Sequence, residues 1–144
     1  MDILNHFDHY GKKQDKEHFM NLIKVALSDG IIDQSESQIL HRMGKKMGFT
    51  DPEIDSLIDS TSKTEFIPPY KLSKRFEQVY DIIKIVLADG VIDSNEMRIA
   101  NAFAIKLGFT EIEMPGLLST LIKGIREGKD EDDLFELYKK ERKH

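Results

Sequence analysis

Apolar side chains recur along this chain every three or four positions, which is the spacing that places them on one face of an α-helix. The first such face, predicted as a helix over about 15–28, consists of Phe19, Leu22, Ile23, Ala26 and Leu27. The second, which ends at Gly48, consists of Ile39, Leu40, Met43 and Met47. Because no segment shows a sustained alternation of period two, we expect an all-α protein without strands.

A third helix is announced by the segment Thr50-Asp51-Pro52-Glu53. Thr50 is suited to cap the helix, proline is tolerated in a first turn, and Glu53 can reach back to the backbone of Thr50. The sequence therefore predicts a capping box at the start of this helix.

The chain also resembles itself at an offset of 60 residues, where 21–58 aligns with 81–118 without a gap. Of these 38 positions, 15 are identical. The identical residues of the first copy are Ile23, Lys24, Leu27, Asp29, Gly30, Ile32, Asp33, Glu36, Ile39, Lys46, Gly48, Phe49, Thr50, Glu53 and Leu57. Such a match predicts a duplicated helical unit.

We expect one helical domain over 1–144, built from two pseudo-symmetric three-helix repeats that share a core. Repeat one covers about 15–61, a linker with two prolines covers 62–70, and repeat two covers about 72–126. The third helix of repeat two spans about 111–126, or begins at Pro115. With a last helix over about 130–141 and a possible short one before Tyr10, the bundle has seven or eight helices.

Both copies carry the motif Asp-Gly-x-Ile-Asp-x-x-Glu between their first two helices, at 29–36 and at 89–96. Its acidic positions and its glycine match positions 5, 6, 9 and 12 of an EF-hand loop. The residues at positions 1 and 3 are apolar, Val25 and Leu27 in the first copy. Only the C-terminal half of a calcium loop is therefore present.

One interpretation is a weak site for a divalent cation, with Ca²⁺ as the expected ion. The ligands would be Asp29, Asp33 and Glu36 in one turn, and Asp89, Asp93 and Glu96 in the other. Carboxylates and one backbone carbonyl would supply about five of the six to eight oxygens that Ca²⁺ takes.

The other interpretation needs no metal. Asp33 followed by Glu36 forms a capping box, and Gly30 ends the preceding helix. Only Asp29 and its counterpart Asp89 stay unexplained, because an acid near a helix C-terminus opposes the helix dipole.

The two segments Leu-Ser-Asp-Gly at 27–30 and Leu-Ala-Asp-Gly at 87–90, each followed by the rest of the motif, resemble the TerB family of tellurite-resistance domains. The family also includes TerB-like modules fused to J-domain co-chaperones, and the resemblance covers about 19–126. It implies an all-helical bundle of two pseudo-symmetric halves in a bacterial protein tied to stress or tellurite resistance, without enzymatic activity. It further implies that the acidic motif residues bind Ca²⁺.

The amino-acid composition excludes several classes of function for this chain. There are 21 Lys and Arg against 26 Asp and Glu, which gives a net charge of −5. This balance argues against a nucleic-acid-binding protein. The absence of cysteine excludes thiol nucleophiles and Cys-ligated metal centres. We expect a cytoplasmic protein without a transmembrane segment or secretory signal.

Three hypotheses follow for the function. The first is a non-enzymatic TerB-like module that binds a cation and an unidentified protein partner. The second is a metal-free protein–protein interaction module in which the motif only caps helices. The third, a small hydrolase, would need a deep pocket lined by both acidic turns. His41 has Asn101 as its counterpart, so the repeat assigns it no role as a ligand or base.

Overall fold

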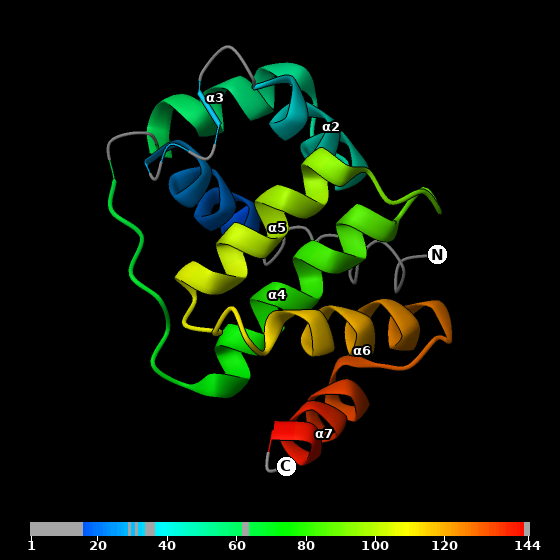
Figure 1. Cartoon of the computed structure of the whole chain (residues 1–144). Helices are drawn as coiled ribbons and strands as arrows, with labels where there is room; N and C mark the ends of the chain where they lie inside the picture. The colour runs from blue at the N-terminus through cyan, green and yellow to red at the C-terminus, as the bar shows by residue number, and fades with distance from the viewer. Residues whose placement is uncertain (1–15, 29, 31, 34–36, 62–63, 143–144) are drawn as a thin grey trace, which may run out of the picture. The chain divides into compact units, whose positions relative to one another are not determined.

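The protein is seen here in a computed structural model that describes residues 16–28, 30, 32–33, 37–61 and 64–142. Residues 16–28 are helical. Six further helices follow: α2 (Gln38–Lys46), α3 (Asp51–Thr61), α4 (Leu72–Leu87), α5 (Ser94–Lys106), α6 (Met114–Arg126) and α7 (Glu131–Arg142) (Figure 1). The described residues contain no strand, so the all-α prediction is confirmed for them. The short helix expected before Tyr10 lies outside them.

The chain divides into two compact units, Met1–Phe66 and Ile67–His144. The boundary falls within the predicted linker 62–70. That the two units form one domain with a common core stays a prediction.

The first unit packs α2 and α3 with the helical segment 16–28. Gly44 of α2 is the point of closest approach: a Cβ there would lie 2.7 Å from Ile54 of α3 and 2.9 Å from the Phe19 ring. The rings of Phe19 and Phe49 stack at 5.7 Å. Most of the side chains that the helical spacing placed on the two apolar faces are buried, namely Phe19, Leu22, Ile23, Ala26, Ile39, Leu40 and Met43. Leu27 and Met47, which were also expected there, are only half-buried, whereas Val25 is buried without having been predicted.

The second unit places α5, α6 and α7 around α4. Phe76 of α4 meets two aromatic rings of α7, Phe135 at 5.0 Å and Tyr138 at 5.5 Å. Gly124 of α6 lies directly under Leu134 of α7, which lets the two helices approach closely. Thus α7 is part of the core of this unit.

Helices α2 and α5 end in the same way. Gly48 and Gly108 have φ of 94° and 111°, a left-handed conformation that glycine adopts without strain. The amide of Phe49 donates to the Gly44 carbonyl, and that of Phe109 donates to the Ala104 carbonyl. These bonds form a Schellman motif, which satisfies carbonyls at the helix end.

The predicted capping box is present at α3. The Thr50 amide donates to Glu53 Oε1 over 2.9 Å, and the Glu53 amide donates to Thr50 Oγ1 over 3.3 Å. In the second unit Thr110 and Glu113 exchange the same bonds. Helix α6 then begins at Met114 rather than at Glu111. This is one residue before Pro115, the alternative start that the sequence predicted, so the proline lies in the first turn.

Candidate functional site

The acidic turn of the second unit connects α4 to α5. Helix α4 ends at its C-cap Ala88, and Gly90 has a φ of 80°. Asp89 Oδ1 accepts a hydrogen bond of 3.2 Å from the Val91 amide. This local bond is one that aspartate commonly forms in turns, so Asp89 has a structural role even though its charge lies near a helix C-terminus.

Asp93 is the N-cap of α5. Its Oδ1 accepts hydrogen bonds from the amides of Asn95 at 2.9 Å and Glu96 at 3.0 Å. The negative charge also lies at the positive end of the α5 dipole. Asp93 therefore satisfies two amides that the first turn of a helix leaves without partners.

Glu96, the last acid of this motif, lies in the first turn of α5 and is only 2 % exposed. The carboxylates of Asp89, Asp93 and Glu96 are thus held in three different settings within one turn. Asp89 turns back to its own loop, Asp93 caps the helix, and Glu96 is buried.

A hard cation such as Ca²⁺ takes six to eight oxygens at about 2.3–2.6 Å. In the part of the chain that the structure describes, no three His, Asp or Glu side chains gather so that they would hold a metal ion. This part includes all three acids of the second turn, so as arranged they do not form a ready-made metal centre.

Of the predicted ligands in the first turn, only Asp33 belongs to the described residues, and it is exposed. Asp29 and Glu36 lie outside them. Next to Asp33, Ile32 is 1 % exposed and its amide donates to the Ala26 carbonyl over 3.1 Å. The side chain at this position in the second copy, Ile92, is 41 % exposed.

Val91 precedes Ile92 and is 66 % exposed. The second acidic turn therefore presents two adjacent branched apolar side chains to solvent. The backbone on either side of them is held by the hydrogen bonds of Asp89 and Asp93. We refer to Val91 and Ile92 below as the apolar turn tip.

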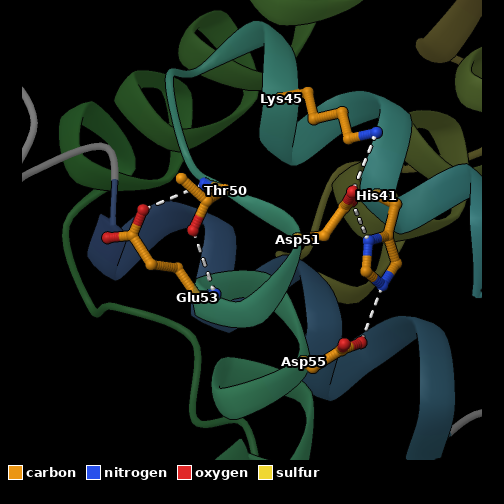
Figure 2. A network of polar contacts seen from close by, with 6 residues as sticks. All are labelled: His41, Lys45, Thr50, Asp51, Glu53 and Asp55. Carbon is orange, nitrogen blue, oxygen red and sulfur yellow. Dashed lines mark hydrogen bonds and ion pairs between the residues drawn. The ribbon is translucent and has the colours of Figure 1, made fainter.

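A polar network that the sequence analysis missed joins α2 to α3 (Figure 2). His41 of α2 lies between two carboxylates of α3, Asp51 and Asp55, and Lys45 contacts Asp51 from the other side. Hydrogen bonds from His41, and then from Lys45, lower the pKa of Asp51. The alignment of the chain with itself at an offset of 60 residues gave no sign of this network, because the equivalent positions of the second copy are Asn101, Glu111 and Pro115.

A second network joins α6 to α7. The Tyr138 hydroxyl donates to Glu113 Oε1, and the Thr110 amide and hydroxyl donate to Glu113 Oε2. These three residues line a hollow of about 400 Å³ together with Ile112, Gly116, Leu117, Glu141 and Arg142. The hydrogen bonds of Glu113 are made within the protein, so the network serves the packing of α7.

No helix among the described residues is both long and apolar enough to cross a membrane. Comparison with family models, with curated proteins and with solved structures found no match for this chain.

Proposed function

We propose that this chain is a non-enzymatic helical module that acts through protein–protein contacts, and that its duplicated acidic motif caps and orients helices. The observation that carries this proposal is the arrangement of Asp93, which accepts the amides of Asn95 and Glu96 at 2.9 and 3.0 Å. Asp89 is also accounted for, by its bond to the Val91 amide. The two aspartates of this turn therefore have local roles that need no ligand.

The apolar turn tip supports contact with another protein. Exposed apolar side chains gain free energy when a partner covers them, and Val91 and Ile92 are adjacent. Asp89 and Asp93 fix the backbone on both sides, so little conformational entropy would be lost on binding. We propose this tip as the contact with the unidentified partner.

We also propose that the two units are pseudo-symmetric copies of one helical repeat. Support comes from local bonds that recur at the same offset as the sequence. The Schellman motif of Gly48 recurs at Gly108, and the reciprocal bonds of Thr50 and Glu53 recur at Thr110 and Glu113.

A second candidate function is weak binding of a divalent cation, with Ca²⁺ as the expected ion, in a TerB-like protein linked to stress or tellurite resistance. It is favoured by three carboxylates within the eight residues 89–96, a pattern repeated at 29–36. Without an ion such like charges repel one another, and a cation would draw Asp89, Asp93 and Glu96 together.

Thermal unfolding of the chelator-stripped chain, with and without Ca²⁺ or Mg²⁺, separates the two candidates. The matched variants are Asp93→Ser, which keeps an N-cap oxygen but removes a carboxylate, and Asp93→Ala, which removes both. If the motif only caps helices, Asp93→Ser has a melting temperature close to that of the wild type and Asp93→Ala has a lower one. Neither ion then changes the order of the three melting temperatures. If the second turn binds a cation, the ion raises the melting temperature of the wild type, because it stabilises the fold by about 2.7 kcal/mol at a hundredfold excess over Kd. Both variants then lose the part of that response that comes from the second turn.

The protein-contact part of the proposal is tested by photo-crosslinking in cells. A photoreactive residue at position 91 should yield one defined adduct that Ile92→Lys abolishes. The matched control is the same residue at position 112, because Ile112 is 95 % exposed in the same unit but lies outside the turn tip. Equal crosslinking from both positions would show that the turn tip is not a specific contact.

A further inference from the structure

His41 of α2 lies within hydrogen-bond distance of two carboxylates of α3, those of Asp51 and Asp55. Its Nδ1 lies 2.7 Å from Asp51 Oδ1, and its Nε2 lies 2.8 Å from Asp55 Oδ1. The two aspartates are four residues apart on α3, a spacing that places them on the same helix face. The imidazole ring therefore spans the gap between α2 and α3 (Figure 2).

Whether both contacts are hydrogen bonds at the same time depends on the number of protons on the ring. An ionised carboxylate only accepts hydrogen bonds, and a neutral imidazole has a single N–H. Two contacts with carboxylates at 2.7 and 2.8 Å therefore need N–H groups on both ring nitrogens. With Asp51 and Asp55 both ionised, the two contacts are hydrogen bonds together only when His41 is doubly protonated and positively charged.

Charged groups from both helices surround the ring. From α2, Lys45 Nζ lies 3.1 Å from Asp51 Oδ2, and Arg42 lines the same surface hollow as His41 and Asp51. From α3, the facing groups are the two aspartates. The protonated ring and Lys45 together offset the charges of Asp51 and Asp55, and loss of the ring proton leaves one of these negative charges without its contact.

We propose that His41, Asp51 and Asp55 form a proton-dependent clamp between α2 and α3. The clamp is closed when both ring nitrogens carry a proton, and it keeps one contact when the ring is neutral. Histidine is the side chain that most readily changes charge near neutral pH. In the first unit the contact between α2 and α3 thereby depends on proton binding.

The second unit provides an internal control. Asn101 replaces the histidine, and Glu111 and Pro115 replace the two aspartates. Asn101 does not change charge with pH, so α5 and α6 should show no such response.

Hydrogen exchange of backbone amides in the full chain tests the clamp. The exchange is measured at about pH 5.5 and about pH 8.5, on either side of the ordinary histidine pKa of about 6.5. After correction for the intrinsic effect of pH, the amides of α2 and α3 should lose protection at the higher pH relative to those of α5 and α6. Equal changes in the two pairs of helices would overturn the proposal.

Two substitutions at Asp55, whose side chain is 68 % exposed, sharpen the test without touching the core. In Asp55→Asn the amide nitrogen can donate to a neutral ring while the ring N–H donates to Asp51, so protection should no longer fall at the higher pH. In Asp55→Ala one contact is absent at both pH values, so protection should start lower and change less. If Asp55→Asn loses protection as the wild type does, the clamp is not proton-dependent.

The ring nitrogens of His41 provide an independent readout. Their ¹⁵N shifts, assigned by comparison with His41→Gln, should show two protonated nitrogens at the lower pH and one at the higher. The transition should coincide with the loss of α2–α3 protection. A ring that is neutral while the helices are still fully protected would refute the clamp.

Discussion

The Tyr138 hydroxyl donates a hydrogen bond of 2.5 Å to Glu113, a residue 25 positions earlier in the chain. The same carboxylate accepts the amide and hydroxyl of Thr110. One acid thus closes the capping box before α6 and also anchors α7. Glu113 corresponds to Glu53 at the offset of 60 residues, and in the second unit the residue at this capping position also has a tertiary partner in Tyr138.

Removing the phenol should weaken this anchor. We expect Tyr138→Phe to lower the free energy of unfolding by about 1.5–3 kcal/mol, the range for hydrogen bonds to charged groups, with the lower end favoured because solvent reaches Glu113. Denaturant unfolding measures the change. The matched control is Tyr70→Phe, whose hydroxyl is in water because the residue is 95 % exposed and which should leave stability unchanged.

The contribution of this pair should also depend on pH. Burial, followed by the hydrogen bond and charge of Glu113, raises the pKa of Tyr138 above its ordinary value of 10.0. Burial alone would raise the pKa of Glu113, but hydrogen bonds from Thr110 and Tyr138 outweigh it and lower that pKa below its ordinary 4.5.

The linkage between protonation and folding gives the direction in which each pKa shift changes the stability with pH. The raised pKa of Tyr138 gives a contribution that is complete below pH 10.0 and is lost as the pH rises through the folded-state value. The lowered pKa of Glu113 gives one that is complete above pH 4.5 and is lost as the pH falls through its folded-state value. The stability difference between wild type and Tyr138→Phe should therefore be flat between these limits and decline outside them. A difference that changes near neutral pH would contradict this.

Loss of the α5 cap should be measurable without any ligand. Asp93→Ala removes the acceptor for two amides, and we expect it to lower the free energy of unfolding by about 0.5–2 kcal/mol. Asp93→Asn, which keeps an oxygen acceptor, should recover most of the loss. If both variants lose equally, the charge rather than the hydrogen bonds of Asp93 carries the effect.

Two glycines of α6 should respond to alanine in opposite ways. At Gly124 a Cβ would lie 2.1 Å from Leu134 Cδ2, so Gly124→Ala should destabilise the second unit by about 1–3 kcal/mol through overpacking. At Gly116 no atom lies within 4 Å of the position, so Gly116→Ala should stabilise by about 0.5–1 kcal/mol through better helix propensity. Denaturant unfolding of the two variants should give shifts of opposite sign.

The helices were predictable because each depends on local signals. The spacing of Thr50 and Glu53 predicts the start of α3. Gly48 marks the end of the preceding helix, because glycine adopts the positive φ of that position without strain. The start of α6 was ambiguous because Pro115 fits either a first turn or a break, and the structure places it in the first turn.

The side-chain networks were not predictable in the same way. The contact of His41 with Asp51 and Asp55 depends on how α2 lies on α3, which no periodicity within one helix specifies. Its only trace in the sequence is that all three residues differ together from their counterparts. Asp89 was unexplained because its bond to the Val91 amide depends on the backbone path after Gly90.

The unequal burial of Ile32 and Ile92 has a consequence for how this chain tolerates change over generations. At Ile32, which is 1 % exposed, a polar residue would be removed from water without a partner, so purifying selection for folding alone should hold the position apolar. At Ile92 that constraint is much weaker. Two positions that are identical in sequence are thus open to different substitutions, and the second turn can change its surface at less cost to folding than the first.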